Sequence, residues 1–202
     1  KSRNYNKRDI ITKVEKIAQN DEKTLVRAAA IGVLGKLVEP IYKPLFIRGF
    51  ESESYALIGS SLTSLYQIDK EATINKINSL DDNVKESLAD AITTIYIQDK
   101  DKTKLPFIAN HVLKGMFLTQ NPRTQQIYGE AFRWIAESDN KQAIENLTND
   151  FVKLGLQYKK YNFDKMAINM LNQIVYMQQQ TTNENKEELI IIIKTGMAKL
   201  IE

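Results

Sequence analysis

Cysteine is missing from this sequence of 202 residues, and histidine occurs once, as His111. Without thiols the chain forms no disulfide bond, no cysteine-ligated zinc site or iron–sulfur cluster, and no cysteine nucleophile. A single imidazole also excludes any site that needs two histidines. His111 stands among apolar residues of a predicted helix, which favours a packed histidine over a catalytic base. The sequence therefore contains no recognisable catalytic constellation.

Glycine, proline and long apolar runs are also scarce. The sequence has 8 Gly and 4 Pro, which argues against a turn-rich all-β protein. Its longest apolar run, Leu189–Ile193, is far shorter than the ~20 residues of a membrane-spanning helix. We therefore expect no membrane span. Residues 189–193 are expected in a buried closing helix or, alternatively, on a docking surface.

The net charge is only +3, from 28 basic and 25 acidic residues. The charge is polarised: residues 1–50 carry 11 basic and 5 acidic side chains, whereas residues 51–100 carry 4 and 9. Lysine outnumbers arginine 22 to 6, so bidentate contacts to phosphate are few. A dedicated nucleic-acid-binding protein concentrates basic charge on one face. We expect no nucleic-acid partner.

Apolar residues recur at three- and four-residue spacing along almost the whole chain, which is the period of an amphipathic helix. The pattern predicts an all-α fold of about eleven helices, an α–α superhelix of HEAT- or armadillo-like repeats in one domain over residues 1–202. The expected helices are 7–20, 22–38, 40–49, 52–67, 70–78, 82–98, 104–118, 123–136, about 140–158, 163–179 and about 184–201. Their short connections favour antiparallel neighbours.

Alternate helices of this set share a block of the form apolar–x–x–small–apolar–x–x–apolar. The block occurs at 30–37, 58–65, 88–95 and 128–135, with a degenerate copy at 167–174. Spacings of 28, 30, 40 and about 39 residues are those of a two-helix repeat. The small residues are expected to let the inner helices approach one another closely, so that stacking completes a core that one repeat cannot bury alone.

The segment 21–37 resembles the second helix of a HEAT repeat. The matching residues are Asp21, Val26-Arg27, Ala28 and Leu34-Gly35. The resemblance implies that Asp21 caps the helix and that Arg27 pairs with acidic groups along the stack. Residues 81–88 are a weaker copy, and later copies depart further from the pattern.

A broader resemblance covers most of the chain. Residues 25–46 and 128–134 are similar to the C-terminal helical domain of zinc aminopeptidases of the aminopeptidase N type. This implies a non-catalytic domain that packs on an upstream catalytic domain of the same chain and shapes the access of peptides to its chamber. The family's zinc motif, His-Glu-x-x-His, is absent here, so zinc is implied only for the missing catalytic part. The sequence begins with Lys1, which fits a fragment of a larger chain.

Four residues are the candidate peptide or interface contacts: Arg27, Tyr128, Arg133 and Trp134. The two arginines are expected to attract a peptide carboxylate, and Trp and Arg are frequent in binding hot spots. Catalytic, cofactor and metal sites are expected to be absent from this chain. The alternative function is a free-standing HEAT-like scaffold for protein–protein interaction. Periplasmic, secreted and cytoplasmic locations all remain open.

Overall fold

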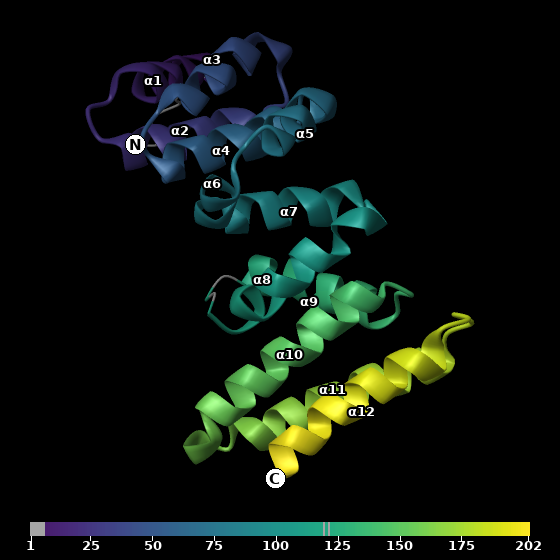
Figure 1. Cartoon of the computed structure of the whole chain (residues 1–202). Helices are drawn as coiled ribbons and strands as arrows, with labels where there is room; N and C mark the ends of the chain where they lie inside the picture. The colour runs from purple at the N-terminus through teal and green to yellow at the C-terminus, as the bar shows by residue number, and fades with distance from the viewer. Residues whose placement is uncertain (1–6, 119, 121) are drawn as a thin grey trace. The chain divides into compact units, whose positions relative to one another are not determined.

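A computed structural model describes residues 7–118, 120 and 122–202, and every regular element in this part is helical. The all-α prediction is confirmed. The chain forms two compact units, which we call unit 1 (residues 1–95) and unit 2 (residues 96–202) and describe separately (Figure 1). A single domain over 1–202 stays a prediction. No helix of the described residues is both long and apolar enough to cross a membrane.

Unit 1 contains six helices and the start of a seventh that continues into unit 2. They are α1 (Lys7–Asn20), α2 (Thr24–Gly35), α3 (Lys43–Arg48), α4 (Tyr55–Tyr66), α5 (Lys70–Asn78), α6 (Asp82–Ser87) and α7 (Ala89–Asp99). Short 3-10 turns, η1 (Pro40–Tyr42) and η2 (Gly49–Glu51), flank α3. Pro40 begins its turn, where a missing N–H has no cost.

The predicted helix 82–98 is interrupted, and this is the main correction within unit 1. Asp81 caps α6 by accepting the Val84 N–H at 3.0 Å, as its sequence position predicts. Leu88 then leaves the helical conformation (φ −104°, ψ 11°) and separates α6 from α7. Leu88 is 3% exposed and lies beside Gly59 of α4. We attribute the break to this packing, which a helical period does not reveal.

The core of unit 1 forms where α2 packs between α1 and α4. Its fully buried side chains include Ile31, Leu34, Phe46 and Leu57. Gly35 makes the α2–α4 contact close, because a Cβ at this position would lie 2.3 Å from Ser64 Oγ. The Ser64 hydroxyl donates to the Ile31 carbonyl at 3.2 Å. The expected close approach of repeat helices is thus found between α2 and α4.

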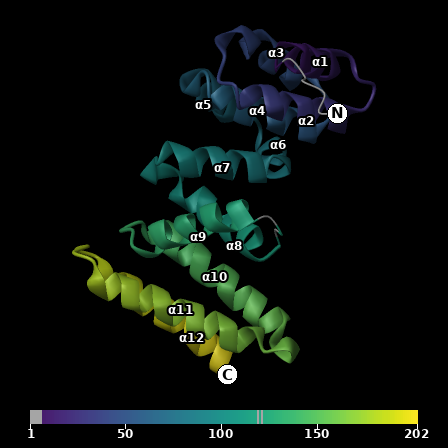
Figure 2. The same cartoon turned by 180° about the vertical axis from the view of Figure 1, so that it is seen from behind.

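In unit 2 the packing centres on helix α10 (Lys141–Gln157), which carries no repeat block. Unit 2 also contains α8 (Leu105–Leu118), α9 (Pro122–Ala136), α11 (Phe163–Gln180) and α12 (Lys186–Ile201), with 3-10 turns at Lys102–Lys104 and Lys159–Tyr161. Helix α10 packs on α8, α11 and α12, and α11 and α12 lie side by side in both views (Figures 1 and 2).

The repeat copies 128–135 and 167–174 lie on α9 and α11, which contact each other only slightly. Helix α10, which carries no copy, is the central helix of the unit, in contact with α8, α11 and α12. Phe151 of α10 is fully buried, and its ring meets Phe132 of α9 edge-on at 6.2 Å between centroids. Close packing between helices that carry the repeat block is therefore found for α2 and α4 in unit 1, and not for α9 and α11 in unit 2.

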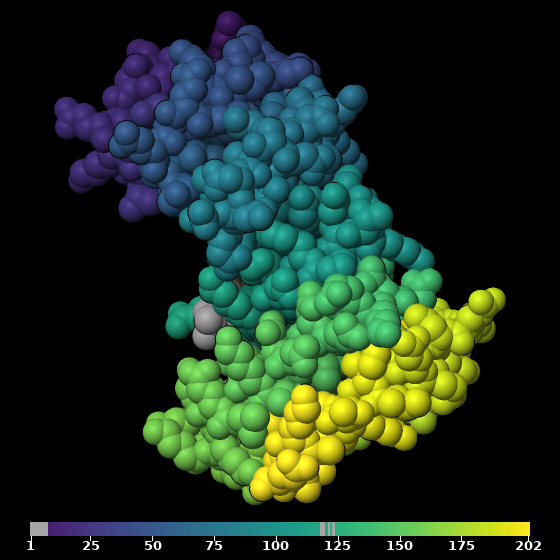
Figure 3. All heavy atoms as spheres, in the orientation of Figure 1, coloured from purple at the N-terminus to yellow at the C-terminus, as the bar shows by residue number. Residues whose placement is uncertain are grey.

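The apolar run 189–193 lies in the closing helix α12, as predicted. Leu189 and Ile193 are fully buried, whereas Ile191 is 65% exposed. Figure 3 shows the yellow atoms of α12 at the surface of unit 2. The run therefore has a buried side, with Leu189 and Ile193, and an exposed side, with Ile191.

Candidate binding site

The turn between α1 and α2 places Arg27 over the end of α1. Asp21 Oδ1 accepts the Lys23 N–H at 2.9 Å. Helix α2 begins at Thr24, with Lys23 at the N-cap and no side-chain cap. The expectation that Asp21 caps this helix is therefore wrong in detail: the helix begins two residues later than predicted, and Asp21 stabilises the turn ahead of it.

The expected pairing of Arg27 with acidic groups is also not seen in the described part of the chain, where no ion pair involves Arg27. Its Nε instead donates to the Ala18 carbonyl at 3.4 Å. The last carbonyls of a helix lack partners within that helix, and a nearby cation stabilises them. This contact uses one N–H of the guanidinium. The guanidinium also lines a hollow in unit 1, where its other N–H donors lie.

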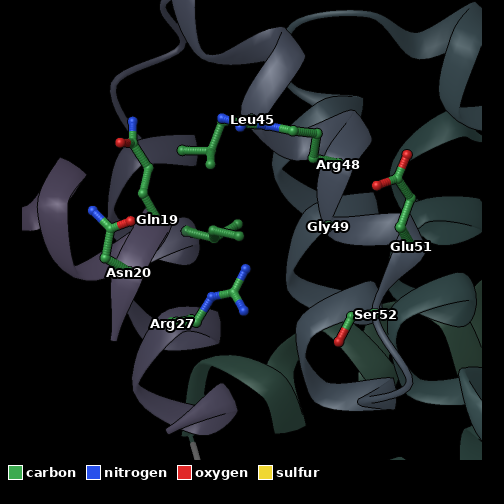
Figure 4. A pocket seen from close by; sticks show the side chains of 9 residues that line it. Gln19, Asn20, Arg27, Leu45, Arg48, Gly49, Glu51 and Ser52 are labelled. Atoms are coloured by element: carbon green, nitrogen blue, oxygen red, sulfur yellow. The ribbon is translucent and has the colours of Figure 1, made fainter. Parts of the chain in front are cut away.

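We call this space the Arg27 hollow; its volume is about 330 Å³. Its lining consists of Gln19, Asn20, Arg27, Ile31, Leu45, Arg48, Gly49, Glu51 and Ser52. Figure 4 shows the Arg27 side chain pointing into the hollow, with Gln19 and Asn20 on one side and Glu51 and Ser52 on the other. The lining is therefore mainly polar, with an apolar floor.

Two arginines, Arg27 and Arg48, and one glutamate, Glu51, line the Arg27 hollow. Within the described residues, neither Arg48 nor Glu51 takes part in an ion pair. The hollow thus has an excess of one positive charge, and its arginines present the paired N–H donors that match a carboxylate. Side-chain amides and a hydroxyl add further hydrogen-bonding groups. The arrangement is suited to holding a single anionic carboxylate.

Arg48 was missed by the sequence analysis. It is the last residue of α3, a six-residue helix whose pattern gives no sign of a partner. Lys43 of the same helix donates to Asp69 Oδ2 at 2.6 Å, and Asp69 caps α5 through the Ala72 N–H. These contacts lower the pKa of Asp69, the Lys43 hydrogen bond having the largest effect. The Lys43–Asp69 pair links α3 to α5, while the buried Phe46 holds α3, the helix that carries Arg48, in the core of unit 1.

Arg133 and Trp134 lie in a second space, in unit 2, which we call the Trp134 hollow. It has a volume of about 580 Å³ and is lined by Lys100, Gln126, Gly129, Glu130, Arg133, Trp134 and Glu137. Lys100 Nζ stands 5.1 Å from the centroid of the Trp134 ring, a cation–π contact. Two basic and two acidic side chains balance here, so the Trp134 hollow attracts a carboxylate less than the Arg27 hollow.

Tyr128, the fourth candidate, lies in the core. It is 2% exposed, and its ring covers Gly115 of α8, where an added Cβ would come within 2.4 Å of ring atoms. Its side chain is therefore not offered to a ligand at the surface of unit 2. The helical period identified Tyr128 as a member of the repeat block but did not show which neighbour it covers.

His111 is buried, at 7% exposure, with its ring centroid 4.6 Å from that of Phe107. Among the described residues, no group of three or more His, Cys, Asp or Glu side chains is placed to hold a metal ion. The residues of this chain therefore do not fit the zinc site of an aminopeptidase.

No family model, curated protein or solved structure matches the chain.

Proposed function

We propose that this chain is a non-catalytic helical-repeat module that binds polypeptide through a free carboxylate. Its most specific form is the C-terminal helical domain of a zinc aminopeptidase, packed on the catalytic domain and shaping the access of peptides to its chamber. The observation that carries the proposal is the Arg27 hollow, with two arginines, one glutamate and several neutral polar groups. Arg27 and Ile31 of its lining belong to the segment 21–37, which resembles a HEAT repeat.

Arg48 is the better residue for the first test, since Arg27 also holds the end of α1. We expect Arg48→Gln to weaken binding of a short peptide about tenfold or more, because a hydrogen bond to a charged group is worth ~1.5–3 kcal/mol. The measurement is titration of the chain with a peptide bearing a free C-terminus and with the same peptide amidated. Arg133→Gln, in the charge-balanced hollow, is the matched control. Equal binding of the free and amidated peptides contradicts the carboxylate site.

The aminopeptidase part of the proposal needs a separate experiment. Peptidase activity is measured with and without zinc, on this chain and on the longest product of its gene. We expect the chain to be inactive and the longer product to be active only with zinc. Arg48→Gln in that active product is expected to change its preference for peptide length. Inactivity of both proteins, with no zinc bound, contradicts the proposal.

A free-standing protein–protein scaffold is the second candidate, and the Trp134 hollow favours it. Trp and Arg side chains are enriched in binding hot spots, and here an exposed Arg133 and a half-buried Trp134 line one space. The two candidates differ in their prediction for the gene product. A scaffold gives no zinc-dependent peptidase activity at any length, whereas an appended domain gives activity once the catalytic part is present.

A further inference from the structure

One end of unit 2 is built from the end of α10, the start of α11 and the end of α12. A Cβ at Gly155 of α10 would lie 2.6 Å from a methyl carbon of Leu200 of α12 and 3.4 Å from the Cα of Asp164 of α11. The α10–α11 turn and the end of α12 therefore lie side by side, as both views show (Figures 1 and 2). We call a set of exposed side chains at this end the Tyr161 face; its members are Lys153, Leu156, Tyr158, Lys159, Lys160, Tyr161, Lys165 and Lys199.

The turn between α10 and α11 is held by its own backbone and by ring packing. The Tyr161 N–H donates to the Tyr158 carbonyl at 2.9 Å. Asn162 then takes a left-handed conformation (φ 60°), which asparagine adopts more readily than most residues. The Tyr158 ring packs on that of Phe163, 5.9 Å between centroids, and Phe163 meets Phe117 of α8 at 6.0 Å. An ordered turn thus carries Tyr161 at its tip.

Large apolar and aromatic side chains of the Tyr161 face are open to solvent. Tyr161 is 67% exposed, Leu156 48% and Tyr158 39%. The Lys160 ammonium stands 4.9 Å from the centroid of the Tyr161 ring, and among the described residues this is the one aromatic or cation–π contact of that ring. Burial in the core therefore does not account for Tyr161 or Leu156, and both remain accessible to a partner.

Positive charge is concentrated at the same end. Residues 153–165 and 197–202 contain five lysines and two acidic residues, a net charge of +3, which equals the net charge of all 202 residues. The five lysines are exposed, whereas Asp164 is half-buried. Lysines that follow the end of α10 stabilise its dipole, but Lys165 lies in the first turn of α11, where a helix disfavours a cation. The positive charge therefore exceeds what the helix ends require.

From these observations we infer that the Tyr161 face attaches this protein to the surface of a membrane that contains anionic lipids. The lysines complement the negative charge of such a surface. Tyrosine is favoured at the level of the headgroups, and a side chain such as Leu156 reaches the boundary of the acyl chains. A contact at the membrane surface requires no membrane-spanning helix.

The composition of the Tyr161 face favours lipid over nucleic acid. The face has lysines and no arginine, although arginine is the residue that makes bidentate contacts to phosphate. Leu156 also has no counterpart in a contact to a sugar–phosphate backbone, whereas basic side chains beside exposed apolar ones are typical of attachment to a membrane surface. The Tyr161 face lies in unit 2 and the Arg27 hollow in unit 1, so this inference and the proposed function fail independently.

Vesicle flotation of the chain is the first test. Vesicles of phosphatidylserine and phosphatidylcholine in equal parts are compared with vesicles of phosphatidylcholine alone. We expect binding to the anionic vesicles only, and we expect it to weaken as salt is added, because salt screens the attraction. The double variant Lys159→Gln, Lys160→Gln is expected to lower the affinity about tenfold or more, since each lysine near an anionic surface contributes about a factor of five. The matched control, Lys13→Gln with Lys16→Gln, removes the same charge from exposed positions of α1 and is expected to change the affinity less than about twofold.

The absence of cysteine allows the contact to be mapped. Tyr161→Cys and Tyr176→Cys each create the only thiol in the chain, at positions of unit 2 that are 67% and 64% exposed. Each thiol is labelled with a fluorophore whose emission depends on the polarity around it. We expect anionic vesicles to shift the emission to shorter wavelength for the label at position 161. The label at position 176, toward the other end of α11, is expected to stay unchanged.

Three results overturn the inference. The first is a lack of binding to the anionic vesicles at low salt. The second is an equal loss of affinity in the two lysine pairs, or an equal emission shift at the two labelled positions, because either result means that charge alone attracts the chain without a defined face. The third is binding of single-stranded DNA or of polyglutamate that Lys159→Gln, Lys160→Gln weakens while vesicle binding is unaffected, which assigns the face to a nucleic acid or to an acidic protein.

Discussion

Units 1 and 2 are both all-helical, yet they achieve close packing in different ways. In unit 1, α2 and α4 pack closely through small residues of the repeat blocks, with Gly35 against Ser64. In unit 2, α10 is surrounded by α8, α11 and α12, and its large side chains fill the centre. Gly155 of α10 lies beneath Leu200 of α12, so close approach also occurs there, outside the repeat. A repeated sequence pattern thus leads to close stacking only where the helices that carry the pattern pack directly on each other.

The polar contacts between helices differ as well. Ser64 in unit 1 makes one buried hydrogen bond to a neighbouring helix. In unit 2, the fully buried Gln178 of α11 donates to the carbonyls of Ala136 and Ser138, at 2.8 and 2.7 Å, and so holds the end of α9. The second unit therefore relies on a long polar side chain where the first relies on short ones.

The strongest test of this comparison is Phe151→Ala in α10. We expect it to lower the free energy of unfolding of unit 2 by about 3–5 kcal/mol, because it removes a fully buried aromatic ring. Hydrogen exchange, measured residue by residue, is expected to accelerate in unit 2 and to stay unchanged in unit 1. Tyr176→Ala, at a 64% exposed position of α11, is the control. Equal acceleration in both units means that they unfold as one.

Gln178→Leu is expected to have the next largest effect. It leaves two buried carbonyls without a donor, and an unsatisfied buried group costs ~1–3 kcal/mol, so we expect a loss of about 2–4 kcal/mol from unit 2 by urea denaturation. Gln173→Leu, exposed on the same helix, is expected to change little. Ser64→Ala in unit 1 is expected to cost about 1 kcal/mol. A larger loss for Ser64→Ala than for Gln178→Leu contradicts the contrast.

Gly35→Ala sharpens the comparison inside unit 1. The added Cβ meets both the side chain and the backbone of Ser64, so α2 and α4 must separate, at a cost of about 1–3 kcal/mol. Gly32→Ala, one turn earlier, meets nothing and is expected to stabilise α2 by up to ~1 kcal/mol. Unit 2 offers the same pair, Gly115→Ala against Gly129→Ala. The thermal unfolding midpoints of the four variants test these expectations. Similar shifts of the midpoint within a pair are incompatible with the packing described.

The smallest effects are expected from two carboxylates whose pKa values move in opposite directions. The Lys43 hydrogen bond lowers the pKa of Asp69 in unit 1, so the stability that it contributes is present above the unfolded-state pKa and is lost as pH falls through the folded-state pKa. Burial raises the pKa of Asp150 in unit 2, against the opposing charges of Lys153 and His111. Ionised Asp150 therefore disfavours folding at neutral pH, and the penalty disappears as pH falls below the ordinary aspartate value.

Asparagine variants separate the two cases. Asp69→Asn is expected to destabilise unit 1 at neutral pH, by a difference that is lost only as pH falls through the lowered pKa of Asp69. Asp150→Asn is expected to stabilise unit 2, by a difference that vanishes once pH falls below the ordinary aspartate pKa. The change for Asp150→Asn is expected to be within ~0.5 kcal/mol. Unfolding curves between pH 3 and 7 measure both. A pH dependence of the same sign in the two variants contradicts the assignment.

The helices themselves were largely predictable. Residues 7–20 and 70–78 have the predicted bounds, and Asp69 and Asp81, each directly ahead of a predicted helix, cap α5 and α6. These signals are local, since they depend on spacing along one helix and on one side chain at its start. The break at Leu88 was not predicted, and Leu88 packs beside Gly59 of another helix, a contact that spacing along one helix does not reveal.

The candidate residues show the same division. Arg27 was predicted from its place in a HEAT-like segment, and it does line a hollow. Its partner Arg48 was missed, because only the folding of α3 toward α1 and α2 brings the two arginines to one space. Tyr128 was predicted as a contact and lies in the core, since a helical period gives the side on which a residue lies but not what covers that side.

The sequence by itself determined an all-α protein, the position of most helices, and a repeat that is strongest in the first hundred residues. It also showed that the chain has one histidine and no cysteine to serve as metal ligands. These properties follow from composition and from periods of three to four residues. The tertiary structure decided that α10 is central in unit 2, that Arg27 and Arg48 line one hollow, and that Leu25 and Val33 of α2 are exposed. Each of these depends on which distant residues meet, and that is settled only when the helices pack.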